Sequence, residues 1–456
     1  MSLAELQPGA HREFLLASFR AAVDAADPRK ILAQFLPSAQ ALRAYGRVIV
    51  VGAGKAGGSM AAAVEDHWRA QALPLESLQG LVITRYGHGA PTQSIEVVEA
   101  GHPVPDQAGE LAAHRILEMA AALTAQDLLI VLVSGGGSSL LSLPVPSVPM
   151  AELKAVTQAL LASGAPIQEM NIVRKHLSQI QGGRLAQATS AKILSLLISD
   201  VPGDDVSAIA SGPTVPDPST YQDALDVLQR WEVQAPASVL RHLQSHAQRA
   251  DQDQETPKPG DPMFERCETH LIATASQSLA AGAQVFREQG IATLVLGDAI
   301  AGEARDVAQV VAAIAKEAHY RGEASLGLAQ KRPLAIISGG ECTVTLRSGA
   351  MAEKSALVRP RGGRCSEFLL ALARELEALP NTWALAADTD GIDGSEDNAG
   401  ALLAPDSLQR AQALGLNARK LLDSNDSWGF FSALGDLIET GPTLTNVNDY
   451  RVVLLA

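Results

Sequence analysis

Short apolar runs that end in glycine-rich loops constrain the fold of this chain most strongly. The run at residues 47–51 leads into the loop Gly-Ala-Gly-Lys-Ala-Gly-Gly, and an alanine-rich stretch at residues 60–72 follows with helical character. Similar units are predicted around the strands at residues 80–84, 128–133 and 192–199. Strands that alternate with helices form mostly parallel sheets covered on both faces. The sequence therefore predicts an α/β fold.

The chain is long enough for two such domains. Residues 244–262 are polar, contain prolines and lack periodicity, which is typical of a linker. Further apolar runs predict a second set of strands at residues 270–274, 292–296, 334–337, 383–387 and 452–455. We predict α/β domains at residues 1–250 and 251–456, with ligands bound in a cleft between the domains.

Composition excludes several classes of protein. Lys and Arg number 36 against 50 Asp and Glu, a net charge of −14, and no basic run is long enough to follow a nucleic-acid backbone. Three cysteines without CxxC spacing indicate neither a disulfide framework nor a zinc site, which favours a cytoplasmic location. No apolar stretch approaches the roughly 20 residues that span a bilayer. We expect neither nucleic acid nor a membrane as a partner.

The first glycine loop is a candidate phosphate site. Gly52 and Gly54 begin the pattern Gly-x-Gly-x-x-Gly, which is typical of dinucleotide sites but weak as a single match. The next predicted strand ends at Arg85 instead of the acidic residue that binds a ribose. Lys55 inside the loop favours phosphate neutralisation over a nicotinamide site, and a tight packing turn is the alternative interpretation.

Two further glycine-rich segments are predicted to bind the nucleotide. Backbone N–H groups in such loops form concavities for phosphate, although a flexible turn would use the same residues. The predicted binding residues in these segments are Ser134, Gly135, Gly136, Gly137, Ser138, Ser139, Gly339 and Gly340.

Three cations next to glycines are candidates for anion binding. Arg364 follows two glycines and could hold a transferring phosphoryl group, because guanidinium meets phosphate in a bidentate fashion. Arg174 and Lys175 precede a second Gly-Gly-Arg segment and are predicted to bind substrate. A surface loop for Arg364, and a solvated helix face for Arg174 and Lys175, are the alternatives.

Two aspartate clusters follow predicted strands. Clustered carboxylates repel each other, so a cation is a natural reason to keep them together, although turns also recruit aspartate for backbone hydrogen bonds. We predict Asp200 as a general base and a metal site formed by Asp204, Asp205, Asp390 and Asp393. Which aspartate acts as base and which as ligand is open from these patterns.

The whole set of motifs resembles the glycerate 2-kinases of the MOFRL family, whose members are also provisionally labelled hydroxypyruvate reductases. The segments that carry the resemblance lie at residues 51–56, 101–106, 134–139, 174–178, 198–205, 211–214, 390–394, 440–443 and 445–449. Three positions depart from the common pattern: Gln181 stands where lysine is common, Cys365-Ser366 where Asn-Gln is common, and Leu444 where glycine is common.

This resemblance implies an N-terminal Rossmann-like domain, a smaller C-terminal MOFRL-type α/β domain and ATP-dependent phosphorylation of D-glycerate to 2-phosphoglycerate. It also implies functional roles for Lys55 and Arg364. We expect ATP with Mg²⁺ or Mn²⁺ as cofactors and a homodimer as one assembly to test. An NAD(P)-dependent hydroxypyruvate reductase is the alternative, and a non-catalytic nucleotide or sugar-phosphate sensor is a third interpretation.

Overall fold

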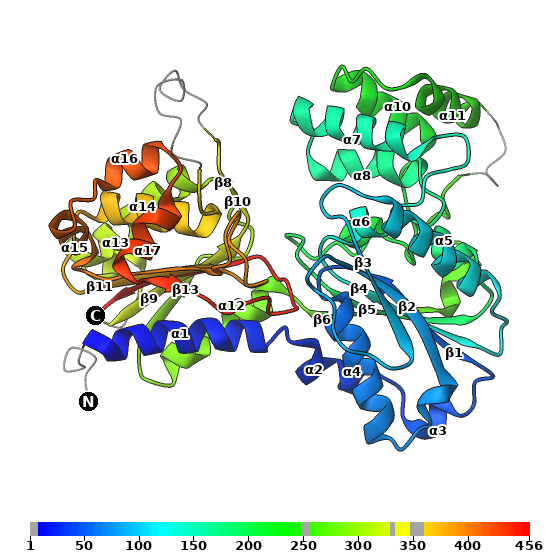
Figure 1. The fold of residues 1–456 in the computed structure, drawn as a ribbon, viewed down its shortest axis with the longest axis horizontal. Helices are drawn as coiled ribbons and strands as arrows, with labels where there is room; N and C mark the ends of the chain where they lie inside the picture. The colour runs from blue at the N-terminus through cyan, green and yellow to red at the C-terminus, as the bar shows by residue number, and fades with distance from the viewer. Residues whose placement is uncertain (1–7, 249–254, 329–332, 347–359) are drawn as a thin grey trace. The chain divides into compact units, whose positions relative to one another are not determined.

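The chain forms two compact units, each built on its own β-sheet (Figure 1). The computed structural model describes residues 8–248, 255–328, 333–346 and 360–456. The first unit comprises Pro28–Ile272, and the second comprises Met1–Asp27 with Ala273–Ala456. The predicted division at residue 250 is wrong in two places. The N-terminal helix belongs to the second unit, and the strand near residue 270 joins the first sheet.

The first unit contains a six-stranded sheet in the order β3-β2-β1-β4-β5-β6, and the pairings from β3 through β5 are all parallel. Its strands are β1 (Val48–Ala53), β2 (Leu78–Arg85), β3 (Ile95–Ala100), β4 (Leu128–Val133), β5 (Lys192–Ile198) and β6 (Cys267–Ala273). Its helices are α2 (Pro28–Ile31), α3 (Ala39–Leu42), α4 (Gly57–Ala70), α5 (Gln107–Ala121), α6 (Gly137–Leu140), α7 (Met150–Ser163), α8 (Ile167–His176), α9 (Arg184–Gln187), α10 (Tyr221–Arg230) and α11 (Ala237–Ala247). This strand order is that of the Rossmann fold, as predicted.

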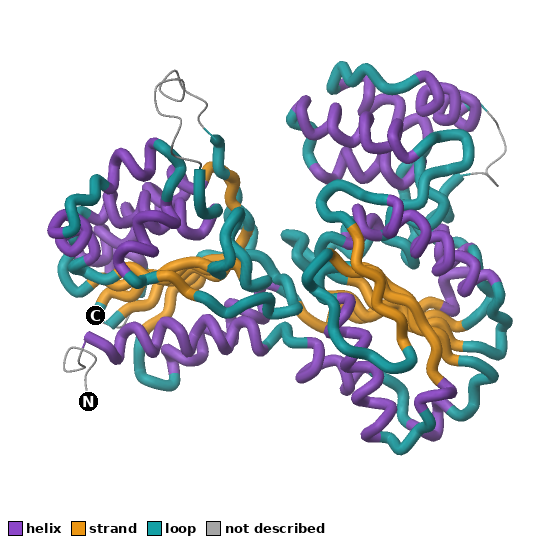
Figure 2. Tube along the Cα trace, viewed as in Figure 1, coloured by secondary structure: helices purple, strands orange, loops and turns teal. Residues whose placement is uncertain are grey.

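Alternation along the strands explains how helices cover both faces of this sheet. Ile49 and Val51 of β1 pack in one cluster with Ile116 of α5. Val82 of β2 points to the other face, where it lies under Gly57 at the start of α4. Figure 2 shows α7, α8, α10 and α11 as a separate helical group in this unit, and their apolar residues form a cluster of their own.

The second unit has a mixed sheet in the order β13-β12-β11-β14-β9-β7, in which only the β7–β9 pairing is parallel. Its strands are β7 (Ala292–Val295), β9 (Leu334–Gly340), β11 (Thr382–Asp388), β12 (Gly400–Leu403), β13 (Leu437–Ile438) and β14 (Asp449–Leu455), with the separate pair β8 (Gly302–Glu303) and β10 (Cys342–Thr343). Its helices are α1 (Pro8–Asp24), α12 (Ala275–Arg287), α13 (Ala304–Arg321), α14 (Arg364–Leu376), α15 (Ser407–Ala413), α16 (Ala418–Asp423) and α17 (Ser427–Leu434).

Helices cover both faces of the second sheet as well. Leu334 and Ile336 of β9 pack with residues of α13 and α14, whereas Ile337 packs with Leu15 and Phe19 of α1. Figure 1 shows α1 (blue) along one face of this sheet and α14 on the other. Burial of its apolar face therefore explains why α1 belongs to the second unit.

The predicted linker at residues 244–262 is also wrong in its described parts. Residues 249–254 lie outside the described residues, but α11 extends into the stretch before them, and Glu255 and Thr256 after them contact the first unit. Glu255 accepts a hydrogen bond from the backbone N–H of Tyr221, and Thr256 donates to Asp217. The expected cleft between domains stays a prediction. Among the described residues, no helix combines the length and apolar character needed to cross a membrane.

Candidate active site

The strand order of the first sheet reverses between β1 and β4. From β1 the chain moves outward through β2 and β3, and it then returns to place β4 on the other side of β1. In open α/β sheets, ligands bind beyond the carboxyl ends of the strands at such a reversal. The loop at residues 54–56 follows β1 and the loop at residues 134–139 follows β4, so both begin at this position.

Hydrogen bonds join these two loops. The N–H of Lys55 donates to the carbonyl oxygen of Gly135 at 2.8 Å, and the N–H of Ala56 donates to Oγ of Ser134 at 3.0 Å. Within the described residues, the N–H groups of Gly135 and Gly136 have no protein acceptor. The junction can therefore offer a lysine and two backbone donors to an anion, which fits the prediction made for the 134–139 loop.

Packing accounts for the first two glycines of the Gly-x-Gly-x-x-Gly pattern. Gly52 lies within β1, and a Cβ atom there would lie 2.0 Å from the carbonyl oxygen of Leu132. A Cβ atom at Gly54 would lie 2.1 Å from Oγ of Ser134. These glycines let β1 and its loop approach β4 closely, which is the packing-turn interpretation. Close packing alone explains why glycine stands at positions 52 and 54, and the predicted contact of these residues with a nucleotide stays a prediction.

His102 belongs to the 101–106 segment of the family resemblance but was not among the predicted site residues, and it lies beside the same junction. Gly136 has a φ of +78°, and a Cβ atom there would lie 2.8 Å from Nε2 of His102 and 3.4 Å from Cγ of Lys55. Gly136 thus leaves room for two side chains from different loops. The segment at residues 101–106 supplies this histidine from the turn that follows β3.

A strained turn adjoins the 134–139 loop. Ala210 and Ser211 have φ values of 48° and 58°, in the left-handed region that side chains with a Cβ rarely occupy. Oγ of Ser211 lies 2.9 Å from Oγ of Ser138 and donates to Oδ1 of Asn171 at 3.2 Å. Strain of this kind concentrates at functional sites. Ser211, which begins the 211–214 segment of the family resemblance, and Asn171 are therefore candidate site residues that were not among the predicted ones.

The two predicted substrate-binding cations separate in the structure. Arg174 donates to Oδ1 of Asn171 at 2.6 Å and lines a small cavity beside Ser139. Burial lowers the pKa of Arg174 to about 10. Nζ of Lys175 instead lies 3.5 Å from Oδ1 of buried Asp217. The geometry favours Arg174 for substrate binding and gives Lys175 a structural ion pair.

The first aspartate cluster follows β5, which pairs with β4. Asp200 comes two residues after the end of β5, at the same edge of the sheet as the 134–139 loop. Asp204 has a φ of 56°, and Oδ1 of Asp205 accepts the N–H of Ser207 at 2.9 Å. Turn formation accounts for part of this cluster, while the position of Asp200 fits a residue that acts near the glycine loops.

Arg364 lies in the second unit among three carboxylates. Its guanidinium donates to Asp449 at 2.7 Å, to Asp388 at 2.6 Å and to Glu341 at 2.6 Å. Although burial opposes its charge, Asp449 and the other two carboxylates raise the pKa of Arg364. Arg451 also pairs with Asp449 at 2.7 Å. A phosphoryl group would have to compete with these carboxylates for Arg364, so its predicted catalytic role stays a prediction.

The remaining predicted residues of the second unit have structural contacts. Asp393 accepts the N–H groups of Cys365 and Ser366 at the start of α14, at 2.9 and 2.8 Å, and burial raises its pKa to about 6. Oδ1 of Asp390 accepts the N–H of Ile392. Gly339 and Gly340 were predicted to bind the nucleotide. Their carbonyl oxygens accept hydrogen bonds from buried Arg451. Both oxygens of Asp393 therefore cap the start of α14, which favours a structural role over metal binding for this residue.

The acidic residues do not assemble a metal cage. Within the described residues, no group of three His, Cys, Asp or Glu side chains is placed to hold a metal ion. Mg²⁺ commonly takes one or two protein carboxylates and completes its shell with phosphates and water. The donor set therefore fits a metal that arrives with a nucleotide, and Asp204 and Asp205 follow β5, the strand that pairs with β4.

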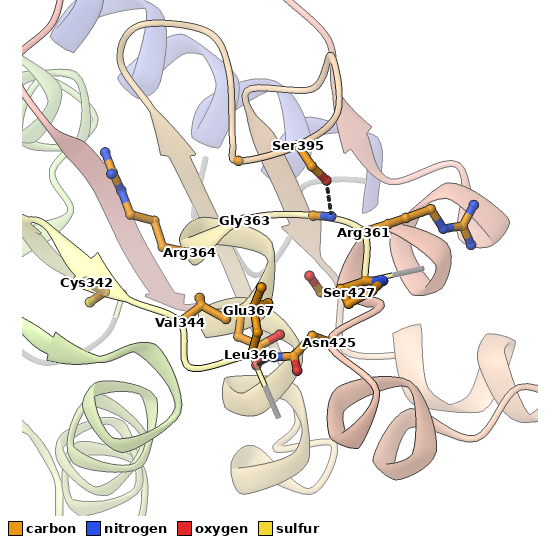
Figure 3. A pocket seen from close by; sticks show the side chains of 13 residues that line it. Cys342, Val344, Leu346, Arg361, Gly363, Arg364, Glu367, Ser395, Asn425 and Ser427 are labelled. Carbon is orange, nitrogen blue, oxygen red and sulfur yellow. Dashed lines mark hydrogen bonds between the residues drawn. The ribbon is translucent and has the colours of Figure 1, made fainter. Parts of the chain in front are cut away.

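A cavity of about 500 Å³ in the second unit surrounds the glycines that precede Arg364 (Figure 3). The side chains of Arg361 and Arg364 extend to opposite sides of Gly363. Arg361 forms a bidentate ion pair with Asp426 and lies 4.6 Å from the ring of Trp428. Each arginine is thus tied to carboxylates of its own surroundings.

Two family models match the chain. A domain of unknown function, DUF4147, matches residues 14–244, and the MOFRL family matches residues 334–449. The first match covers the C-terminal part of α1 and most of the first unit, and the second covers most of the strands of the mixed sheet. The matches therefore include both glycine loops and the surroundings of Arg364.

Proteins with assigned names are similar over nearly the full length. A D-glycerate 2-kinase from Thermotoga maritima is 35% identical and covers 98% of this chain and 99% of its own. A protein from Agrobacterium vitis, provisionally named hydroxypyruvate reductase, is 48% identical over 97% of this chain and 94% of its own. The crystal structure of a glycerate kinase from Thermotoga maritima is similar with a TM-score of 0.82 and 34% identity, and it covers 98% of this chain and 100% of its own. The chain therefore belongs to the MOFRL family that includes these glycerate kinases.

Proposed function

We propose that the protein is a glycerate 2-kinase, which transfers the γ-phosphoryl group of ATP to the 2-hydroxyl of D-glycerate. The named glycerate kinases among its relatives support the reaction class. The observation that carries the proposal is the junction of the 54–56 and 134–139 loops at the reversal of strand order. It combines Lys55 with backbone donors where anionic ligands bind in this fold.

Phosphoryl transfer needs little covalent chemistry from the protein, so catalysis depends mainly on positioning the reactants and stabilising the charge on the phosphate. In this proposal Lys55 and the N–H groups of Gly135 and Gly136 bind phosphate oxygens, and Asp200 accepts the proton of the 2-hydroxyl. Mg²⁺ supplied with ATP would neutralise charge on the phosphates, and Asp204 and Asp205 are the proposed protein ligands. Three cysteines without a disulfide support a cytoplasmic location.

A nicotinamide-dependent reductase is less well supported. Its sequence signal is the Gly-x-Gly-x-x-Gly pattern, but packing against β4 accounts for Gly52 and Gly54. The second strand ends at Arg85, where dinucleotide sites place an acid that binds the ribose. The provisional names of two Agrobacterium vitis relatives also point to this reaction.

One comparison separates the two reactions. Purified protein is supplied either with D-glycerate, ATP and Mg²⁺ or with hydroxypyruvate and NADH or NADPH. The proposal predicts ADP formation that depends on D-glycerate and no oxidation of either reduced nucleotide. Oxidation that depends on hydroxypyruvate, without ADP formation in the first mixture, would establish the reductase instead.

A further inference from the structure

A small cavity in the first unit is lined by two basic side chains, of which Lys154 also interacts with Asp106 outside the cavity lining. It has a volume of about 90 Å³, and its polar lining residues include Ser139, Lys154, Arg174 and Gln181. No Asp or Glu is among its lining residues, although acids outnumber basic residues in the chain as a whole. Binding sites for nucleotide-sized ligands usually measure 300–1,000 Å³. The cavity therefore suits a small anion.

Gln181, which lines this cavity, has one buried acceptor atom without a hydrogen-bond partner among the described residues. The residue is 1% exposed, and its Nε2 donates to the carbonyl oxygens of Ser138 at 2.8 Å and Leu141 at 3.1 Å. Two carbonyl acceptors require the NH₂ group on that side, which determines the orientation of the amide. Oε1 then has no hydrogen-bond partner within the described residues. A buried acceptor left unpaired destabilises the folded protein, so a ligand that donates a hydrogen bond there would remove this penalty.

Arg174 is the second group that requires a ligand. Its guanidinium donates a hydrogen bond to the neutral amide of Asn171, and it forms no ion pair with a described carboxylate. Burial without a carboxylate is also the reason that its pKa falls. Buried charges are normally paired, and guanidinium matches a carboxylate in a bidentate fashion.

We propose that this cavity is the acceptor subsite, in which Arg174 binds the carboxylate of D-glycerate and Oε1 of Gln181 accepts a hydrogen bond from its 3-hydroxyl. The assignment rests on the proposed function. An amide oxygen is too weak a base to take the proton of the reacting hydroxyl, so it suits the hydroxyl that is not phosphorylated. Gln181 is thus a specificity-determining residue, and it distinguishes D-glycerate from acids that lack the 3-hydroxyl.

The subsite shares a wall with the proposed phosphate site. Gln181 holds the carbonyl of Ser138, and Arg174 is joined to Oγ of Ser138 through Asn171 and Ser211. Both ligand-binding side chains therefore connect to the 134–139 loop. Pro103, Leu143 and Leu153 also line the cavity, and apolar lining of this kind excludes water from a phosphoryl acceptor.

The test compares Gln181→Leu with the matched control Gln179→Leu. Gln179 lies two residues away, donates to the carbonyl oxygen of Pro144 and does not line this cavity. Gln181→Leu should raise KM for D-glycerate about tenfold with KM for ATP within twofold, since one hydrogen bond is lost. It should also reduce the preference for D-glycerate over D-lactate, measured by competition, by a similar factor. An unchanged preference, or an equal rise in both KM values, would overturn the assignment.

A binding measurement keeps the test independent of turnover and of the stability of Gln181→Leu. Calorimetry on the wild-type protein without ATP should show D-lactate binding at least tenfold more weakly than D-glycerate, and Arg174→Met should abolish binding of both acids. Equal affinity for the two acids in the wild type contradicts the role of Gln181. If D-glycerate binds more tightly than D-lactate but no phosphoglycerate forms, the proposed function is wrong and the subsite stands. If phosphoglycerate forms but Gln181→Leu keeps the wild-type preference for D-glycerate over D-lactate, the subsite alone is wrong.

Discussion

The N–H of Lys55 donates to the carbonyl oxygen of Gly135 at 2.8 Å, so the loops after β1 and β4 are connected at the reversal of strand order. These residues are 80 positions apart in the chain. At the same junction, the side chains of Lys55 and His102 both lie close to Gly136. The two glycine-rich segments therefore form one candidate phosphate site that includes Lys55.

Replacement of Lys55 by methionine should lower kcat about 10²-fold or more, because one preorganised positive charge is removed from the developing phosphate charge. Lys192→Met is the matched control. Lys192 begins β5 at the opposite edge of the sheet, and its side chain is half exposed. The control should keep the wild-type kcat in steady-state assays. A Lys55→Met enzyme as fast as the control would exclude Lys55 from the reaction.

Arg364→Ala should destabilise the protein strongly. It leaves buried Asp388 without this partner and reduces the charge compensation at Asp449, and breaking a buried ion pair commonly costs about 3–5 kcal/mol. Glu341→Gln is the comparison, because the Glu341 side chain is 57% exposed and exposed pairs contribute about 0–1 kcal/mol. Urea unfolding of both variants measures the difference. Equal losses in the two variants would contradict the buried network.

Asp393→Ala should lower the free energy of unfolding by at least about 1 kcal/mol, because α14 loses the acceptor of two N–H groups at its start. Asp393→Asn keeps one acceptor oxygen and should lose less. If Asp393 acts as a cap, the Mg²⁺ concentration for half-maximal activity should stay within twofold in Asp393→Asn. A large rise in that concentration, with stability unchanged, would restore Asp393 as a metal ligand.

His242 should make the protein less stable in acid. Burial and the neighbouring His246 lower the pKa of His242 to about 4, and an unfolded histidine has a pKa of about 6.5. Between these values the unfolded state binds more protons, so the free energy of unfolding falls as the pH decreases from about 6.5 towards 4. Urea unfolding at several pH values should show a shallower dependence for His242→Gln. The same dependence in both proteins would contradict a buried neutral His242.

Local pattern was sufficient for much of the first sheet. Residues 128–133 were predicted as a strand and are β4, since a fully apolar run between polar residues and a glycine loop has few alternatives. Both glycine loops were also expected at the carboxyl ends of strands. β3 was missed because this edge strand is only partly buried and carries two glutamates. The second sheet was expected from its apolar runs, but their pattern did not indicate mostly antiparallel pairing.

The parts that sequence could not provide depend on contacts between distant residues. Ser211 and Asn171 are 40 positions apart in the chain. Position 211 holds neither glycine nor asparagine, so the residue type does not indicate the left-handed backbone found there. The open Oε1 of Gln181 follows from two carbonyls some 40 positions earlier. Arg174 and Lys175 are adjacent in sequence, but Asp217, 42 positions after Lys175, forms an ion pair with Lys175. Such assignments require the tertiary structure.

The most direct test is the position of phosphorylation. Purified protein is incubated with D-glycerate, ATP and Mg²⁺, and enolase is added, because enolase consumes 2-phosphoglycerate without a mutase. We predict phosphoenolpyruvate formation with enolase alone, at a rate that Lys55→Met lowers about 10²-fold. A signal that appears only after phosphoglycerate mutase is added, or no phosphoglycerate at all, would contradict the assignment as a glycerate 2-kinase.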